Sequence, residues 1–345
     1  MAKKDIVVIG ASAGGVEALM QLVAGLPADL DASIFVVVHI PIGAPSALPR
    51  ILSRRGHMPA VHASDGERIH AGTIYVAPPG AHLIIEAKKI SLIRGPREHG
   101  LRPAVDPLFL SAALEFGPRV VGVLLSGNLD DGTAGLEAIK KRGGTTIVQD
   151  PAEALYPGMS LSAIDSGCAD KVLPVAQIAA ALTDDIKRSR TATLARAEAV
   201  DMDDENEEKE KELAIDKLDI GQLQSDDQPG TVSAFTCPEC NGTLWELTSS
   251  DTLRYRCRVG HAFAVDSLLA KQQESVESAF WIALRALEER ASLLRRLSER
   301  AQKNNNKSAV RRYTHEEEIV VKRAKTLRDV ILSGIVGDET EATAS

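Results

Sequence analysis

Short apolar runs alternate with amphipathic stretches over residues 1–183. The runs that predict strands are DIVVIG (5–10), SIFVVVH (33–39), TIYVAP (73–78), HLIIEA (82–87), ISLIRG (90–95), VVGVLLSG (120–127) and TTIVQD (145–150). Helices are predicted near 15–26, 45–54, 105–116, 132–143 and 174–188. Apolar strands flanked by helices are typical of a doubly wound, mostly parallel α/β sheet. The closely spaced strands of 73–95 predict an antiparallel excursion from it.

Two long helices are predicted near the end of the chain, over 266–300 and 308–333, with KNNNK between them. Apolar residues recur at every third or fourth position of each helix. They are Val276, Phe280, Ala283, Leu287, Ala291 and Leu294, then Val310, Tyr313, Val320, Ala324, Leu327 and Ile331. One interpretation is an antiparallel hairpin that buries its own seam. The other is that the seam docks on another coiled coil, such as a receptor or a second copy of the chain.

The acidic excess of the chain is concentrated in one segment. The net charge is −8, and it falls almost wholly within residues 184–232, which include DMDDENEEKEKE. This segment has very few aromatic or β-branched residues, so it predicts a solvated, disordered linker, helical near 190–215. With only 3% aromatic residues and this acidity, the chain is not expected to bind nucleic acid.

No stretch of the sequence approaches the roughly 18 to 20 apolar residues that cross a bilayer, so direct membrane insertion is not expected. The opening MAKKDIVVIGASAGG begins like a signal peptide, but its apolar run soon gives way to glycine and Glu17. A first strand and a cytoplasmic protein are the better interpretation. The domains expected are 1–188 (α/β), 189–232 (linker), 233–265 (a Cys/His module), 266–335 (helical hairpin) and 336–345 (disordered tail).

The glycine-rich loop after the first run is GASAG, with Ser12 at its centre. A dinucleotide loop needs glycine at that position and an acid after the second strand, whereas this chain has Ser12 and His39. A phosphate-binding P-loop would need G-K-[ST], which is absent. The pattern G-x-S-x-G instead favours a turn that exposes a nucleophilic serine.

Ser12, His39 and Asp131 all follow predicted strands, and sites in open α/β sheets lie beyond the carboxyl ends of the strands. A serine hydroxyl needs a base to take its proton and a third group to orient that base. His39 and Asp131 suit those two roles. Each residue also has a purely structural interpretation, as a helix cap, a packed histidine or an Asp-Gly turn.

Several motifs in order resemble one known family. They are IGASAGGVEAL (9–19), VVVHIP (36–41), YVAPPGAHL (75–83), RPAVDPLF (102–109), LLSGNLDDGTAGL (124–136) and VQDPAEALYPGMSLSAI (148–164). Over about residues 4–185, the chain resembles the catalytic domain of the chemotaxis protein-glutamate methylesterases, the CheB type.

This resemblance implies a cytoplasmic signalling hydrolase that needs no cofactor for catalysis. Its substrates would be glutamate methyl esters on the helices of chemoreceptor-type proteins, with methanol released, and it would also deamidate glutamine. Ser12 would be the nucleophile, His39 the base and Asp131 the orienting acid. Amides near Ser12 and near the 127–129 turn would bind the oxyanion. The residues expected around the substrate are Ala13, Gly14, Arg102, Asn128 and Met159, with a structural salt bridge as the alternative role of Arg102.

Some positions depart from the family pattern. Ala13 replaces a frequent threonine, Asn128 a methionine, Leu129 a glycine and Ser160 a proline. Regulated members also carry a receiver domain before the esterase, so gating by phosphorylation within this chain is not expected. The altered turn keeps a second hypothesis open, in which the scaffold and its tail serve as a non-catalytic or retargeted signalling adaptor.

Cys237, Cys240, Cys257 and His261 stand at C-x2-C-x16-C-x3-H spacing. Three thiolates and one imidazole suit a tetrahedral structural Zn²⁺ in a zinc-ribbon-like module. A redox pair, a site that has lost its metal and, more weakly, disulfides are the alternatives. The other histidines show no paired spacing and are interpreted as surface or loop residues: His57, His62, His70, His82, His99 and His315.

Overall fold

The computed structural model describes residues 3–41, 46–192, 210–215, 217, 230–247 and 251–333. The chain divides into two compact units, Met1–Leu268 and Leu269–Ser345. Most of the expected linker, 193–209 and 218–229, and the expected tail, 336–345, lie outside the described residues. No helix of the described residues is both long and apolar enough to span a membrane.

A parallel sheet of seven strands forms the centre of the first unit, which confirms the predicted fold class. Its strand order is β3-β4-β2-β1-β7-β8-β9, and every pair is parallel. The strands are β1 (Ile6–Ala11), β2 (Ser33–Val38), β3 (Ala60–His62), β4 (Ile74–Val76), β7 (Val120–Leu124), β8 (Thr145–Gln149) and β9 (Lys171–Leu173). The predicted antiparallel excursion is limited to β5 (His82–Glu86) and β6 (Lys89–Ile93), because β4 pairs parallel to β2.

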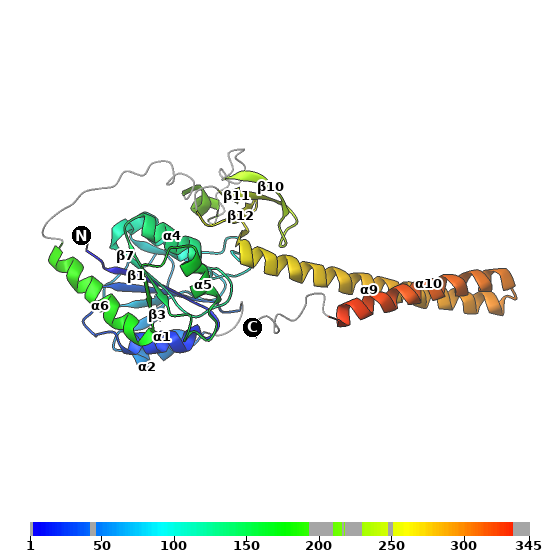
Figure 1. Cartoon of the computed structure of the whole chain (residues 1–345), viewed down its shortest axis with the longest axis horizontal. Coiled ribbons are helices and arrows are strands. Elements are labelled where there is room, and N and C mark those ends of the chain that lie inside the picture. Colours follow the sequence, from blue (N-terminus) through cyan, green and yellow to red (C-terminus); the bar gives the residue numbers. More distant parts are fainter. Residues whose placement is uncertain are drawn as a thin grey trace. The chain divides into compact units, whose positions relative to one another are not determined.

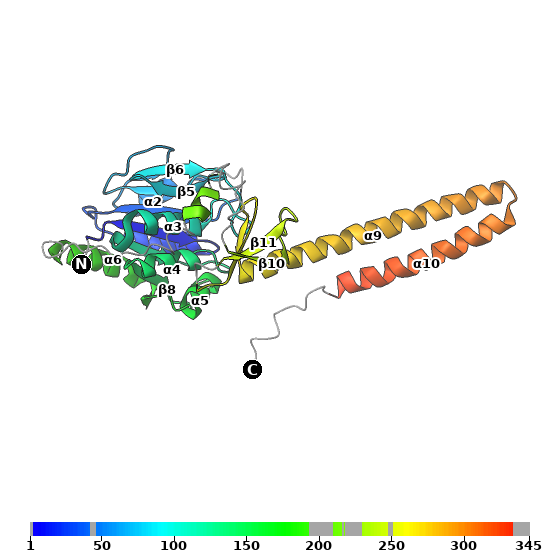
Figure 2. The ribbon, with the colours of Figure 1, turned by 90° about the horizontal axis from the view of Figure 1, so that it is seen from above.

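Helices cover both faces of this sheet, as Figure 1 and Figure 2 show. One face carries α1 (Gly15–Ala24), α2 (Leu48–Arg55) and α6 (Val175–Ala192); the other carries α3 (Val105–Phe116), α4 (Thr133–Lys141) and α5 (Gly158–Asp165), with a 3-10 turn at Gly117–Arg119. Alternate residues of β1 enter opposite cores: Val7 and Ile9 face α1, whereas Ile6 and Val8 face α3. The sheet is thus buried on both sides, which explains its continuous apolar runs.

A small antiparallel sheet follows in the same unit, in the order β10-β11-β12-β13. Its strands are β10 (Thr231–Thr236), β11 (Thr243–Leu247), β12 (Arg254–Cys257) and β13 (Ala262–Ala264); we call β10–β13 the ribbon module. Residues 210–215, at the end of the stretch predicted to be helical, are indeed helical, but the prediction of a solvated linker is wrong for this piece. Glu212 and Ile215 are fully buried there, so this piece of the acidic segment packs as part of the fold.

The second unit is the predicted helical hairpin, formed by α9 (Val265–Lys303) and α10 (Lys307–Leu332), and Figure 2 shows the two helices running back along each other. Its seam contains Ala291, Leu294 and Val320. Asn306 ends the connection by accepting a hydrogen bond from the N–H of Ala309 at 3.1 Å. Val276 and Ala283, which the periodicity predicts in the seam, are exposed, whereas Leu284 is buried, at 5% exposure.

Candidate active site

Three neighbouring strands, in the order β2-β1-β7, bring the sequence-predicted residues together at the carboxyl edge of the sheet. Ser12 follows β1 directly and His39 follows β2 directly. Asp131 lies in the turn that connects β7 to α4. Parallel strands end at the same edge, so residues far apart in sequence meet here.

The three side chains form one hydrogen-bonded chain. His39 Nδ1 lies 2.9 Å from Ser12 Oγ, and His39 Nε2 lies 2.7 Å from Asp131 Oδ2. With its proton on Nε2, the imidazole donates to the carboxylate and presents the free lone pair of Nδ1 to the serine hydroxyl. The Asp131 side chain is only 2% exposed, whereas Ser12 is partly exposed. The serine hydroxyl thus faces solvent, and the carboxylate of Asp131 is shielded from it.

The carboxylate of Asp131 is held from behind by the start of α3. Its Oδ2 accepts a second hydrogen bond from the N–H of Val105 at 2.7 Å, and its Oδ1 accepts one from the N–H of Asp106 at 3.0 Å. Burial opposes ionisation, but the nearby His99 and the hydrogen bond with His39 outweigh it and hold the pKa of Asp131 well below its usual range. Asp131 is therefore a carboxylate at neutral pH.

The serine turn differs from the strained elbow of α/β-hydrolases. Ser12 does not adopt a positive φ. The left-handed conformation falls on Gly14 instead, with φ 69°, where glycine avoids the strain of a side chain. The N–H of Ser12 donates to the carbonyl of Ser126 at 2.9 Å, and Ser126 Oγ donates to the carbonyl of Ala13 at 2.8 Å. These bonds tie the serine turn to the end of β7.

The 127–129 turn borders Ser12 from the β7 side. Its Gly127 N–H donates to the carbonyl of Tyr156 at 2.9 Å, so this amide, expected as an oxyanion donor, already has an acceptor. Asn128 is exposed, and Leu129 adopts φ 62° with 38% exposure. A glycine at the position of Leu129 would take this left-handed conformation without strain.

Of the other two residues expected near the site, one lies beside the serine. Met159 is fully buried on α5, and an ideal Cβ built at Gly127 would meet both Met159 Sδ, at 1.9 Å, and Ser12 Cβ, at 2.8 Å. Arg102 is partly buried and donates from its Nη1 to the backbone carbonyls of Arg94 and Gly95. The alternative prediction, a salt bridge of Arg102, is not found among the described residues.

Two of the histidines assigned to the surface or to loops are buried: His82 lies in β5, which corrects that prediction, and His99 lies in a loop but is shielded from solvent. His82 Nε2 lies 2.9 Å from the carbonyl of Pro96, and burial lowers the pKa of His82. His99 Nε2 lies 3.0 Å from Asp106 Oδ2. Burial opposes protonation of His99, but Asp131, Asp106 and Asp130 prevail and raise its pKa to about 9. A buried imidazolium thus lies directly behind Asp131. The residues around His99 in the sequence form no motif that indicates this position.

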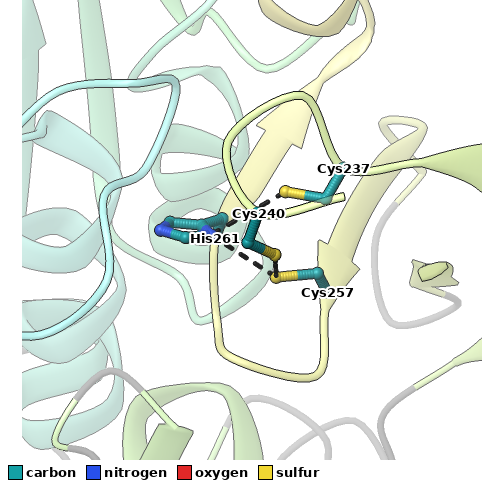
Figure 3. Close-up of side chains that lie close together, drawn as sticks. All are labelled: Cys237, Cys240, Cys257 and His261. Atoms are coloured by element: carbon teal, nitrogen blue, oxygen red, sulfur yellow. Dashed lines mark hydrogen bonds between the residues drawn. The ribbon is translucent and has the colours of Figure 1, made fainter. Parts of the chain in front are cut away.

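The four Cys/His residues of the ribbon module also converge, and Figure 3 shows their side chains pointing toward one centre. Cys237 and Cys257 Sγ lie 3.8 and 3.6 Å from His261 Nδ1, and Cys240 Sγ lies 3.6 Å from Cys257 Sγ. Ligands at about 2.3 Å (sulfur) and about 2.0 Å (nitrogen) from a tetrahedral Zn²⁺ would be separated by about 3.5 to 3.8 Å. All the described cysteines are free thiols, and the cluster can hold a metal ion.

A parallel α/β sheet that aligns a serine, a histidine and an aspartate at its carboxyl edge is the architecture of a serine hydrolase. Comparison with known proteins places the chain more narrowly. It belongs to the CheB methylesterase family, whose family model matches residues 7–182.

Curated relatives share this region. A "protein-glutamate methylesterase/protein-glutamine glutaminase 2" of Anaeromyxobacter dehalogenans is 41% identical over 183 residues, which are 53% of this chain and 54% of the relative. The "protein-glutamate methylesterase FrzG" of Myxococcus xanthus is 39% identical over 178 residues, 51% of this chain and 53% of the relative. The chain therefore spans about half the length of the curated relatives it matches.

A solved structure matches the same half of the chain. The CheB methylesterase catalytic domain of Thermotoga maritima aligns with a TM-score of 0.51 and 35% sequence identity, and the match covers 52% of this chain and 98% of that domain. The family model ends at residue 182, before the ribbon module and the hairpin.

Proposed function

We propose that this protein is a serine hydrolase that removes methyl esters from glutamate side chains of chemoreceptor-type helical proteins and releases methanol. The observation that carries the proposal is the hydrogen-bonded chain from Ser12 through His39 to Asp131. The names of the relatives, which are protein-glutamate methylesterases, support glutamate methyl esters as the substrate. The cytoplasmic location expected from the sequence is part of the same proposal.

In the first half of the reaction, Ser12 Oγ attacks the ester carbonyl while its proton passes to His39 Nδ1, 2.9 Å away. Asp131, at 2.7 Å from Nε2, stabilises the imidazolium that forms. The tetrahedral intermediate collapses as His39 returns the proton to the methoxy oxygen, and methanol leaves. The glutamyl group is then bound to Ser12 as an ester.

In the second half, His39 takes a proton from water, and the resulting hydroxide attacks the glutamyl ester. Collapse releases a glutamate carboxylate and restores the hydroxyl of Ser12, with His39 as the proton donor. A glutamine side chain follows the same course with ammonia as the leaving group. This is the basis for proposing deamidation as a second activity.

The backbone amides of Ala13 and Gly14 are the best candidates to hold the oxyanion. They lie between Ser12 and the N-terminus of α1, where amides lack helical partners and the helix dipole favours negative charge. Among the described hydrogen bonds, neither N–H has an acceptor. One such donor typically contributes on the order of 100-fold to the rate.

The rim of the site suits an amphipathic protein segment. Leu155 lies against Gly14, and its side chain is 73% exposed. Leu129, Tyr156 and Leu161, on the neighbouring turns and α5, are 38 to 44% exposed. Exposed apolar groups around a polar centre are typical of a protein-binding surface. We propose that this rim contacts the apolar side of the substrate helix.

We further propose that Cys237, Cys240, Cys257 and His261 hold a structural Zn²⁺ with no part in the reaction. Four protein ligands leave no open position for substrate or water. The hydrogen bond between two of the thiols lowers the pKa of Cys257 and raises that of Cys237. The hairpin is the place where a helical partner or a second copy would dock, through exposed residues of α9 such as Trp281 and Ile282.

The test is methanol release from receptor fragments that carry labelled glutamate methyl esters. The full chain should release methanol, and Ser12→Ala should release none above background. If only a small synthetic ester is cleaved, the triad works but the receptor assignment is wrong. If neither substrate is cleaved, the adaptor hypothesis, which the altered 127–129 turn favours, replaces the enzyme.

A further inference from the structure

The ribbon module lies directly against the loop behind the active site, within the first compact unit. The N–H of His99 donates to the carbonyl of Ala262 at 2.7 Å, and the N–H of Ala262 donates to the carbonyl of Arg97 at 3.3 Å. Next to this backbone pairing, Arg256 is 1% exposed and donates to Glu98 at 2.5 Å. A buried ion pair joined to backbone hydrogen bonds indicates a fixed interface.

The first turn of α9 clamps the residue that precedes Asp131. Asp130 is 3% exposed, and its Oδ2 accepts hydrogen bonds from the N–H groups of Asp266, at 2.9 Å, and Ser267, at 3.4 Å. Its Oδ1 accepts a hydrogen bond from Ser267 Oγ. Asp130 thus caps the N-terminus of α9, where a negative charge is favoured.

His99 connects this clamp to the triad. Its Nδ1 lies 3.0 Å from Ser267 Oγ and 3.5 Å from Asp130 Oδ1. Its Nε2 lies 3.0 Å from Asp106 Oδ2 and 3.6 Å from Asp131 Oδ1. One buried ring therefore lies against three carboxylates and the hydroxyl of Ser267, which comes from the first turn of α9.

We propose that His99 and Ser267 are positioning residues for the hydrolase, which hold the Asp130–Asp131 turn so that Asp131 stays aligned under His39. The proposal rests on the hydrolytic function of Ser12 proposed above. It makes the ribbon module and the first turn of α9 part of the active-site framework, beyond the region that resembles other methylesterases.

Charge balance explains why these residues matter. Asp106, Asp130 and Asp131 lie together in a region shielded from water, and like charges that are buried side by side repel one another strongly. The raised pKa of His99 supports a single positive charge at their centre. Glu98 does not share this role, because Arg256 and Arg254 pair with it. Asp266, the remaining carboxylate nearby, is more exposed, and burial beside Asp130 raises its pKa.

The loss of either residue should slow the chemical step rather than binding. Ser267→Ala removes the hydroxyl that joins His99 to Asp130. His99→Asn removes the central charge, and asparagine tolerates the positive φ of 53° at this position. Misplacement of a catalytic group by about 1 Å costs about 100-fold, so we expect kcat to fall by about 10- to 100-fold with KM unchanged.

The experiment uses the full chain, with p-nitrophenyl acetate for kcat and KM and a fluorophosphonate probe for the labelling rate of Ser12. Ser111→Ala is the matched control, because Ser111 is 1% exposed and also makes two hydrogen bonds, at 3.0 Å each, but away from the triad. Thermal unfolding verifies that each variant is folded. The control should lose stability and keep its kcat.

A pH profile separates positioning from general loss of structure. In the wild type, the labelling rate should fall as pH rises through about 9, where His99 loses its proton, and this fall should be absent in His99→Asn. The inference is overturned if folded Ser267→Ala and His99→Asn chains keep the kcat of the Ser111→Ala control. It is also overturned if the fall in labelling rate at alkaline pH is unchanged in His99→Asn. Wild-type chain that labels no faster than Ser12→Ala refutes the hydrolase itself, and with it the inference.

Discussion

The replacement of Arg256 by methionine tests a buried ion pair between the ribbon module and the esterase fold. Arg256 is among the largest fully buried side chains, with Nη2 2.5 Å from Glu98 and 3.5 Å from Glu212. Methionine retains much of the apolar volume but removes the charge. Among the described ion pairs, Glu98 and Glu212, at 1 and 0% exposure, would then keep the pairs with Arg254, at 3.9 and 3.0 Å respectively.

Removing one partner of a buried ion pair costs about 3 to 5 kcal/mol, because the other charge remains buried without compensation. For a unit of this size, 1 kcal/mol corresponds to a shift of about 2 to 4 °C in Tm. Arg256→Met should therefore lower the midpoint of the transition that unfolds the first unit by roughly 6 to 20 °C. Differential scanning calorimetry of the full chain measures this shift, and circular dichroism follows the same transition.

The matched control lies in the same interface. Arg97 is paired with Glu239 at 3.6 Å, and its side chain is 42% exposed, so Arg97→Met should cost less than about 1 kcal/mol. The double variant Glu98→Gln/Arg256→Met should recover part of the loss, because it removes the stranded charge of Glu98. Equal shifts for Arg256→Met and Arg97→Met would show that the buried network does not anchor the module.

Four further predictions follow from the candidate active site and from the Cys/His cluster. Gly127→Ala should reduce the rate of ester hydrolysis by about 100-fold or more, because its Cβ would lie 2.8 Å from Ser12 Cβ. A folded variant that keeps the wild-type rate would refute this prediction. Asp131→Asn should lower kcat by about 10⁴-fold. The pKa of Asp131 is depressed on folding, so its ionised form stabilises the fold above about pH 4, and this contribution is lost at lower pH. Urea titrations should therefore show that Asp131→Asn loses less free energy of unfolding than the wild type between pH 5 and 2. An equal loss in both chains would contradict the assignment. Purified chain should contain about one Zn²⁺ per molecule, and Cys257→Ser should contain less Zn²⁺ and have a lower Tm. If elemental analysis finds a zinc content near zero in the reduced wild type, the metal proposal is wrong.

Strong periodicity made most of the fold predictable, and short elements were missed for identifiable reasons. β3 and β9 are strands of three residues each, too short to show an alternating pattern. They form because β4 and β8 present unpaired edges to them. The helix α5 was missed because only Met159, Ser160 and Ala163 of its eight residues are buried, so small polar residues obscure its apolar face. Tertiary contacts decide such segments.

The candidate site was predictable where strand ends carry it. Ser12 and His39 follow apolar strands directly, and Asp131 precedes a glycine in the next turn, so topology alone brings them to one edge. His99 and Ser267 could not be predicted in the same way. They are far apart in sequence, neither stands in a recognisable motif, and they meet only because the ribbon module folds back onto the 97–99 loop.

The departure from the family pattern at Leu129 has a structural explanation in these same contacts. A leucine in the left-handed region costs roughly 1 to 2 kcal/mol, and such strain persists only where neighbouring contacts fix the backbone. Here the carbonyl of Tyr156 holds Gly127 on one side of Leu129, and Ser267 and the N-terminus of α9 hold Asp130 on the other. The turn is thus fixed independently of residues 128 and 129. Substitutions at these two positions change the exposed rim for which we propose contact with the substrate, whereas the alignment of Asp131 with His39 depends on contacts made from behind.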